Sequence, residues 1–287
     1  MTAISAAMVN QLRKMSGQGM MDCKQALQET DGDVDKAMEM LRKKGLATLV
    51  KRAERETKNG LVVCKTGEDG KSAAMATLCC ETDFVAKSDD FINATKALGD
   101  YAFACPQNEG IDNCLDTEID GKKYRDILTE LVSKTGEKTQ VGDFQKFVVE
   151  NPGFISTYIH FNEKVGTMVL IESDASIADN QALRNTGNDI AMHVTATKPL
   201  ALDKDQIDPK MIESERSIFS EQVKDKPANI IDKIVDGKIS KFFAENCLVE
   251  QPFVKDDSKT VAQVLTDAAK QAGGQAKIVK YVRFELG

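Results

Sequence analysis

The spacing of apolar residues changes at Gly60, and this change limits how the chain can fold. Before it, Ile4, Met8 and Leu12 recur at every fourth position until Ser16-Gly17 ends the run, as expected for one face of a helix. After it, short apolar runs of strand length begin. We therefore expect a helical first part, followed by a region that mixes strands and helices.

Two more short helices are predicted before the change. Residues 20–29 present apolar side chains at spacings of three and four, and Asp33 in the following turn can cap a third helix that ends at Gly45. Three short helices with tight glycine turns predict a small UBA-like bundle, which would be only marginally stable by itself. The charged residues 46–58 predict a helical linker, and we place the bundle with its linker in residues 1–55.

The region after Gly60 begins as a β-hairpin. Its turn is Glu68-Asp69-Gly70, a sequence that favours a tight connection between two strands. The predicted elements of this first α+β unit, residues 56–151, are strands at 61–64 and 73–80 and helices at about 90–105 and 124–134. The helices would cover one face of the sheet.

A similar order of elements returns after Asn151-Pro152-Gly153. The predicted elements of this second α+β unit are strands at 154–161, 165–172, 247–254 and 278–286 and helices at about 179–196 and 261–272. The unit therefore occupies residues 152–201 and 247–287. Two units of similar order predict an α+β fold with a duplicated core.

The intervening residues 202–246 predict an inserted pair of helices. Helices at 211–224 and 228–246 are separated by Lys226-Pro227. The apolar stripe of the second helix consists of Ile231, Val235, Ile239 and Phe242. This pattern is typical of an antiparallel helical hairpin, or coiled coil. Two arrangements remain open: the hairpin protrudes and pairs with another copy of the chain, or it packs back on its own unit.

The composition argues against several classes of protein. With 38 Lys and Arg against 45 Asp and Glu, the 287 residues carry a formal charge of −7, which argues against a surface that wraps nucleic acid. A basic cluster in residues 42–58 is interrupted by Glu54 and Glu56 and lacks aromatic residues, so it favours a solvated helix or linker over an RNA contact. No apolar run reaches about 18 residues, and residues 1–10 lack the pattern of a signal peptide.

The cysteines indicate a reducing compartment. There are seven, an odd number, without a Cys-x-x-Cys pair or a suitably spaced histidine, which argues against a disulfide framework or a structural zinc site. We therefore expect a cytoplasmic protein without a membrane segment. Cys79 and Cys80 follow an apolar strand run, so two buried thiols are favoured over a redox pair.

No residue pattern predicts a catalytic, cofactor-binding or metal site. The segment from Gly67 to Ser72 ends like a phosphate-binding loop, but Lys65 stands where the first glycine should be, and the segment joins two strands. A hairpin turn is therefore favoured. His193 lies in an apolar helical run, which favours a packed or surface histidine, whereas His160 lies at a predicted strand end, where a polar contact to a partner is favoured.

The segment from Glu81 to Phe91 is the most informative part of the chain, because it lies where a strand ends and a helix begins. Its residues suited to cap a helix are Thr82, Asp83, Ser88 and Asp89. Phe84 and Val85 therefore fall on a connection bordered by polar groups. Two interpretations remain open: a hydrophobic staple that holds the connection against the core, or an exposed aromatic anchor for the pocket of a partner.

Four motifs carry a resemblance to a known family. They are Met15-Ser16-Gly17-Gln18-Gly19-Met20-Met21-Asp22-Cys23-Lys24-Gln25-Ala26-Leu27, Thr82-Asp83-Phe84-Val85-Ala86-Lys87, Tyr158-Ile159-His160 and Asp189-Ile190-Ala191-Met192-His193-Val194. In this order they closely resemble translation elongation factor Ts. The resemblance covers almost the whole chain and includes the helical-hairpin insertion and the ending Arg283-Phe284-Glu285.

The resemblance implies a guanine-nucleotide exchange factor for elongation factor Tu, a GTPase of translation elongation. The implied partner-binding residues are Asp83, Phe84, Val85 and Ala86, which would disturb the magnesium and phosphate site of the GTPase, with further contacts from Met20, Met21 and His160. Residues 202–246 would form a homodimer through the coiled coil. Some relatives carry a further C-terminal helix that contacts the GTPase, whereas this sequence stops at Gly287, just past its last predicted strand.

Such a role requires neither a catalytic group nor a cofactor. An exchange factor binds the nucleotide-free GTPase more tightly than the nucleotide-bound form, and linkage requires that it weakens nucleotide binding by the same factor. Two other classes remain as alternatives. A small thiol or phosphate-handling enzyme would need a cysteine of low pKa, and a dimeric adaptor with an unrelated partner would leave GDP release unchanged.

Overall fold

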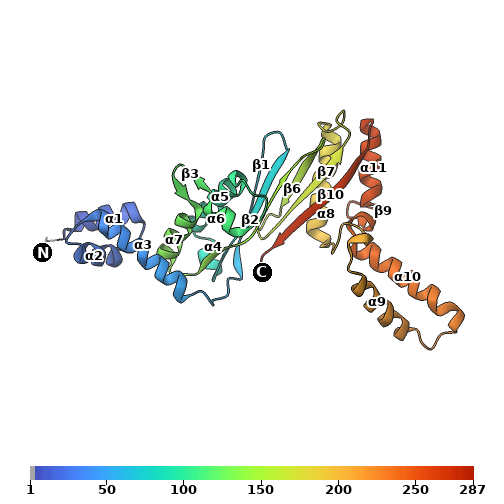
Figure 1. Cartoon of the computed structure of the whole chain (residues 1–287), viewed down its shortest axis with the longest axis horizontal. Coiled ribbons are helices and arrows are strands. Elements are labelled where there is room, and N and C mark those ends of the chain that lie inside the picture. Colours follow the sequence, from blue (N-terminus) through green and yellow to red (C-terminus); the bar gives the residue numbers. More distant parts are fainter. Residues whose placement is uncertain (1–3) are drawn as a thin grey trace.

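The computed structural model describes residues 4–287, apart from the side chains of residues 49, 50, 228 and 229, and shows an elongated molecule (Figure 1). Three helices lie at the amino-terminal end, two sheets with their helices lie in the middle, and a pair of helices projects at the far end. The predicted α+β class is confirmed. Among the described residues, no helix combines the length and the apolar character that crossing a membrane requires.

The amino-terminal helices are α1 (Ala6–Ser16), α2 (Met20–Glu29) and α3 (Val34–Lys51). Ser5 caps α1 by accepting a hydrogen bond from the Met8 N–H (3.3 Å). Gly17 ends α1 with a φ of +67°, which favours glycine. The three helices share one buried core, formed by Val9, Leu12, Cys23, Ala26, Leu27, Ala37 and Leu41.

Helix α3 does not end at Gly45, as the sequence predicted, but continues past it, so the start of the predicted linker belongs to this helix. Gly45 is buried where α3 crosses α7 (Tyr124–Thr135). A Cβ at Gly45 would lie 2.8 Å from the Thr129 carbonyl oxygen and 2.9 Å from Ser133 Cβ. The glycine therefore permits a close helix crossing instead of ending a helix, and the amino-terminal helices pack directly on the first α+β unit.

The first α+β unit contains a three-stranded antiparallel sheet of order β1-β2-β5. Its elements are β1 (Asn59–Thr66), β2 (Ser72–Cys80), α4 (Asp83–Ala86), α5 (Asp89–Ala104), α6 (Ile111–Asp116), β3 (Glu118–Ile119), β4 (Lys122–Lys123), α7 and β5 (Thr139–Val148). The predicted strands and long helices are present. Strand β5 was missed by the sequence analysis, because polar residues and Gly142 interrupt its apolar pattern.

The second unit contains a sheet of order β6-β7-β10. Its elements are β6 (Gly153–Ile159), β7 (Val165–Ser173), α8 (Gln181–Thr197), the 3₁₀ helix η2 (Leu248–Glu250), β8 (Pro252–Phe253), β9 (Asp256–Thr260), α11 (Val261–Ala272) and β10 (Ala276–Glu285). The predicted strand at 247–254 was wrong: η2 occupies its first half, Cys247 forms only an isolated bridge with Ala201, and the strand β8 has two residues. The buried side chains Leu248 and Phe253 explain its apolar pattern, since both pack into the core of this unit.

The two sheets pack face to face, and helices cover their outer faces. On the central strand β2, Ala76 and Leu78 face the helices, whereas Ala73 and Met75 face the second sheet. Strand β7 alternates in the same way, with Ile171 facing its helices. Because both faces are covered, the central strands carry nearly continuous apolar runs.

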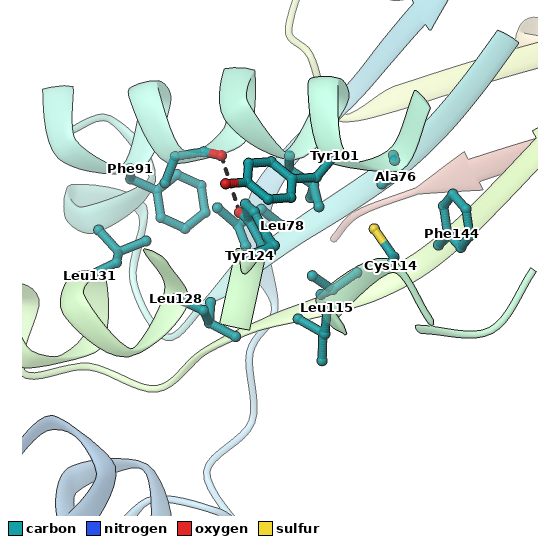
Figure 2. Packing of buried hydrophobic residues seen from close by; sticks show 14 of the residues in the cluster. Ala76, Leu78, Phe91, Tyr101, Cys114, Leu115, Tyr124, Leu128, Leu131 and Phe144 are labelled. Carbon is teal, nitrogen blue, oxygen red and sulfur yellow. Dashed lines mark hydrogen bonds between the residues drawn. The ribbon is translucent and has the colours of Figure 1, made fainter. Parts of the chain in front are cut away.

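Figure 2 shows the outer core of the first unit, where aromatic rings from α5 and α7 meet above β2. The rings of Tyr101 and Tyr124 lie 5.4 Å apart, and Phe91 fills the space beside them. The buried Tyr124 hydroxyl donates a hydrogen bond to the Ala94 carbonyl oxygen (3.1 Å), which compensates for its removal from water.

The two units repeat the same order of elements. Each has a glycine at or next to the start of its first strand, Gly60 in β1 and Gly153 in β6, and both have a φ of +156°. A Cβ at Gly60 would lie 2.0 Å from the Leu78 carbonyl oxygen, and a Cβ at Gly153 would lie 2.2 Å from the Ile171 carbonyl oxygen. Both glycines therefore lie directly against the central strand of their own sheet.

Reciprocal hydrogen bonds relate the two units by an approximate twofold axis. The Val62 N–H donates to the Glu163 carbonyl oxygen (2.7 Å), and the Ile155 N–H donates to the Gly70 carbonyl oxygen (2.9 Å). Val62 and Ile155 each lie two residues after the first glycine of their unit. The β6–β7 turn thus lies beside the start of β1, and the β1–β2 turn lies beside the start of β6.

The helical pair consists of α9 (Pro209–Gln222) and α10 (Ala228–Asn246), preceded by the 3₁₀ helix η1 (Lys204–Gln206). The two helices pack on each other through Phe219, Val223, Val235 and Ile239, and they extend away from the sheets (Figure 1). The chain enters and leaves the pair at adjacent positions, because the Leu248 N–H donates to the Ala201 carbonyl oxygen (2.9 Å). The second unit is therefore continuous at the base of the insertion.

Candidate partner-binding surface

The segment between β2 and α5 forms the one-turn helix α4, which Thr82 caps, and Ser88 caps α5 directly after it. Thr82 Oγ1 accepts a hydrogen bond from the Val85 N–H (3.3 Å), and Ser88 Oγ accepts one from the Phe91 N–H (3.4 Å). Ser88 also donates to the Val85 carbonyl oxygen (2.7 Å). Thr82 and Ser88, two of the four residues that the sequence analysis singled out as caps, thus shape a tight corner between two helices, and Asp83 and Asp89 are the first residues of those helices.

The corner separates its apolar residues by exposure. Phe84 is 82% exposed, Val85 is half-buried against the core of the first α+β unit, and Ala86 is 8% exposed. The staple interpretation is therefore wrong for Phe84, whose ring lies in solvent, although Val85 and Ala86 do hold the corner against the core. The fold gains nothing from an exposed phenyl ring, so the anchor interpretation of Phe84 is favoured.

Asp83 is the first residue of α4 and is exposed beside Phe84. Its Oδ2 accepts a hydrogen bond from Lys87 Nζ (2.8 Å). This hydrogen bond and the attraction of the ammonium group lower the pKa of the Asp83 carboxyl. Asp83 therefore stays ionised near neutral pH and places a negative charge next to the exposed ring.

Half-buried charges fix the base of α4. Glu137, in the connection after α7, accepts hydrogen bonds from the Thr82 N–H (3.0 Å) and the Thr82 hydroxyl (2.7 Å). Glu81 accepts two hydrogen bonds from Arg52, at 2.8 and 2.9 Å, and one from the Lys138 N–H at 2.6 Å. These contacts join the end of α3, the start of α4 and the connection after α7 into one junction.

The pKa of Glu81 reflects this junction. Burial by itself raises the pKa of the carboxyl, but the hydrogen bond from the Lys138 N–H and the ion pair with Arg52 outweigh it and hold the pKa below its ordinary value. Glu81 is therefore ionised near neutral pH, and its charge contributes to the position of α4.

The β6–β7 turn, beside the start of β1, carries the neighbouring rings of His160 and Phe161. The ring centroids of His160 and Phe161 lie 4.4 Å apart. Tyr158 Oη lies 3.4 Å from His160 Nδ1 within hydrogen-bonding distance, and His160 is half-buried. Phe161 is 89% exposed, more than Phe84. The predicted partner contact His160 thus lies on an exposed turn, in a position that a partner can reach.

Met20 and Met21 lie on the outer face of α2. Met20 is 50% exposed and Met21 is 73% exposed, whereas Cys23 and Leu27 on the other face are buried in the small helical core. Methionine side chains are flexible and polarisable, which suits contacts with a partner. The amino-terminal helices therefore present an apolar patch at a distance from α4 along the molecule (Figure 1).

His193 is a packed histidine and takes no part in this surface. Its Nδ1 accepts a hydrogen bond from the Val254 N–H (3.2 Å), so its Nε2 carries the proton and donates to Gln251 Oε1 (2.9 Å). Burial lowers the pKa of the imidazole, and the hydrogen bond to Gln251 opposes this only in part. The imidazole is therefore neutral near pH 7 and ties α8 to the segment before β9.

The cysteine thiols and the segment from Gly67 to Ser72 show few features of a catalytic or phosphate-binding site. Burial raises the pKa of the Cys64, Cys80 and Cys114 thiols to about 12, so these groups are poor nucleophiles, which argues against a thiol enzyme that would use them. The segment from Gly67 to Ser72 is a hairpin turn, as predicted. In the part of the chain that the structure describes, no three His, Cys, Asp or Glu residues gather in a way that could hold a metal ion.

Sequence reasoning missed the residues that fix α4 and one exposed ring. Glu137 lies 55 positions from Thr82, so no local pattern could reveal their contact. Phe161 had a signal that was not used: it is an aromatic residue at the end of the predicted strand 154–161 and directly before Asn162, a residue common in turns.

The chain matches the family model described as Elongation factor TS over residues 81–287. Curated relatives extend the similarity over the remaining residues. The elongation factor Ts of a Nitratiruptor species is 42% identical over 287 residues, which cover 99% of this chain and 93% of the relative. Those of a Clostridium botulinum strain and of Desulfovibrio desulfuricans are 39% and 38% identical, over 99% and 100% of this chain and 93% and 99% of the relatives.

Proposed function

Because this chain belongs to the elongation factor Ts family of translation elongation factors, we propose that it accelerates the release of GDP from the GTPase elongation factor Tu. The observation that carries the proposal is the placement of Phe84: an aromatic ring 82% exposed on a one-turn helix that two caps and the Glu137 contact hold in place. A ring prepared in this way loses little conformational freedom on binding.

The proposed contact begins at the segment from Asp83 to Ala86. Phe84 enters a pocket of the GTPase near its magnesium and phosphate site, and Asp83 brings a negative charge that repels the nucleotide phosphates. Val85 and Ala86 support the segment from the core side, as their burial indicates. The inserted ring of Phe84 and the negative charge of Asp83 both disfavour bound nucleotide. An exchange factor must weaken nucleotide binding in this way.

The other proposed contacts flank this segment. The amino-terminal helices, as a UBA-like module, dock on the same GTPase through Met20 and Met21, and His160 contacts it from the β6–β7 turn. The division of the chain into residues 1–55, 56–151, 152–201 with 247–287, and 202–246 belongs to the same proposal. The protein acts in the cytoplasm by differential binding, without a catalytic group, a cofactor or a direct contact to nucleic acid.

The helical pair α9–α10 is proposed as a coiled-coil contact between two copies of the chain. Met211 and Ile218 on α9 are 44% and 47% exposed, so an apolar face is free for a partner helix within the described residues. Replacing residues 204–244 by a short Gly-Ser linker tests this role. We expect a folded protein with altered oligomeric state, because the hydrogen bond between Leu248 and Ala201 closes the base. Global unfolding would contradict it.

The test of the proposed function is the rate of release of a fluorescent GDP analogue from purified elongation factor Tu. We expect catalytic amounts of this chain to increase the rate, and Phe84→Ala to remove most of the increase. Leu200→Ala, which shortens an apolar residue 59% exposed in the second unit, serves as the matched control and should keep the wild-type rate. An unchanged release rate with the wild-type chain at saturating concentration would reject the proposal.

A further inference from the structure

The two hairpin turns of the core have the same backbone geometry. Residues 67–71 connect β1 with β2, residues 160–164 connect β6 with β7, and the first four residues of each connection form the turn. In each turn the fourth residue donates its N–H to the carbonyl oxygen of the first, at 2.9 Å from Gly70 and at 2.8 Å from Glu163. The fourth residue has a positive φ in both turns, +68° and +55°. The turns therefore form a matched pair under the approximate twofold axis.

Their side chains differ at the second position. The third residue, Asp69 or Asn162, accepts the N–H two residues later in both turns, at 2.9 and 3.0 Å, as turn residues commonly do. The second residue is Glu68 in one turn and Phe161 in the other. Since the same backbone forms with an exposed glutamate, the fold does not require an aromatic ring at this position.

The turn that carries Phe161 is held at several points. Besides its internal hydrogen bond, the Glu163 carbonyl oxygen accepts the Val62 N–H (2.7 Å), and the Lys164 carbonyl oxygen accepts the Leu286 N–H (2.9 Å). The ring is nevertheless 89% exposed, and its neighbouring ring is His160. A ring exposed on a rigid turn has its orientation fixed before any partner binds.

The turn and α4 lie at the same end of the core. Asn59, the first residue of β1, donates a side-chain hydrogen bond to the Glu81 carbonyl oxygen just before α4 (3.0 Å). Val62 on the same strand donates to Glu163 in the turn. Three residue steps along a strand span about 10 Å. One short stretch of β1 therefore positions both exposed rings, Phe84 and Phe161.

We propose that Phe161 is a second aromatic anchor, which binds the same GTPase that the α4 segment engages. This inference rests on the proposed function, and the occupant follows from continuity: the ring lies at the end of the core that carries α4 and His160. Two rings set on separate elements contact the partner at two points and fix its orientation, so that Phe84 meets its pocket in a defined direction.

The test compares variants of the matched turns in binding to nucleotide-free elongation factor Tu and in GDP release. Phe161→Glu copies the residue of the twin turn, Phe161→Ala removes the ring, and Phe161→Leu keeps an apolar side chain. We expect the first two to weaken binding by about tenfold to a hundredfold at unchanged melting temperature, and Phe161→Leu to stay within about threefold of wild type. Glu68→Ala, the control in the other turn, should bind like wild type.

A double-mutant cycle separates direct contact from an effect through the neighbouring ring. If Phe161 only positioned His160, Phe161→Ala would weaken binding no further in a His160→Ala background, and this result would overturn the inference. A normal affinity of Phe161→Glu, with exchange still impaired in Phe84→Ala, would overturn it while leaving the proposed function intact. A change in self-association alone, measured by sedimentation, would overturn it as well. A wild-type chain that neither binds the GTPase nor accelerates release would reject both.

Discussion

The two connections from central strand to helix, residues 81–88 after β2 and residues 174–180 after β7, occupy equivalent places in the repeated core. The fourth residue of each connection is apolar. In the first it is Phe84, which is 82% exposed, and in the second it is Ile177, which is 1% exposed. The connection with the exposed residue is one residue longer and contains the capped turn α4.

This difference separates the features of the first connection that the fold requires from those that we assign to binding. Ile177 packs into the core of the second unit, where a Cβ at Gly274 would lie 3.0 Å from its Cδ1. The second unit thus buries the residue at this position in its own core. The outward ring of Phe84 is therefore an addition to the scaffold, and the connections can be compared by mutation.

The largest effect on stability is expected from Ile177→Ala. The change removes a buried side chain and leaves a cavity, so the free energy of unfolding should fall by about 2–5 kcal/mol. GDP release per folded molecule should be unchanged, because the second connection carries no exposed ring. Urea denaturation, together with release assays at a temperature where the variant is folded, checks both points. A stable variant with slow exchange would reverse the roles that we assign to the two connections.

Phe84→Ala should show the opposite pattern. Its ring is in solvent in the free protein, so the melting temperature should stay close to wild type. Burial of the ring in the partner would contribute about 1.5–3 kcal/mol, so binding and exchange should fall by about tenfold to a hundredfold. Differential scanning fluorimetry and GDP release measure the two quantities on one sample. A fall of many degrees in melting temperature with normal exchange would show that Phe84 is packed after all.

Glu137→Ala should give a smaller and mixed effect. The change removes both acceptors of Thr82, each of which contributes about 1 kcal/mol, and loosens α4 without touching its exposed ring. Exchange should fall severalfold, with a modest loss of stability. The matched change in the second unit is Asp174→Ala, which removes the acceptor of the Gln275 N–H (2.8 Å) and should leave exchange unchanged. Equal exchange rates for the two variants would show that the Glu137 contact does not position α4.

The smallest effect concerns pH. The pKa of Glu81 is below its ordinary value of 4.5 in the folded protein, so the stability from this group is present above pH 4.5 and is lost as the pH falls through the lower, folded pKa. Glu81→Gln removes the titrating group. Its stability should therefore fall less steeply than that of wild type below pH 4.5, in chemical denaturation at several pH values. If the stability of the two proteins fell equally steeply with decreasing pH, Glu81 would contribute nothing to the loss of stability in acid.

Local pattern was sufficient to predict most helices and the central strands, because each has one face or both faces in a core. Helix α11 and the hairpin of β1 with β2 are examples. It failed at Gly45, where a glycine serves a helix crossing that involves residues more than 80 positions away. It also failed at residues 247–254, whose buried side chains suggested a strand although the backbone turns.

The candidate site was predictable in position but not in geometry. Polar caps around Phe84 indicated a corner, and the family resemblance named its residues. Whether the ring lies inward or outward depends on what covers the corner, and the sequence of the corner itself does not contain that information. The contacts of Thr82 with Glu137 and of Glu81 with Arg52 come from segments 55 and 29 positions away, so only the folded chain brings them together.

Because α3 continues past Gly45 without a break, this helix holds its two ends at a fixed separation. Eighteen residues at about 1.5 Å each give a rod of about 27 Å, which starts among the helices that carry Met20 and Met21 and ends next to Arg52, at the base of α4. A linker would let the two contact regions vary in separation, whereas a rod that is packed on α7 keeps it constant. Under the proposed function, the Met20–Met21 surface and the α4 segment therefore meet the GTPase at a fixed separation, and only a partner whose two binding surfaces match that separation can contact both.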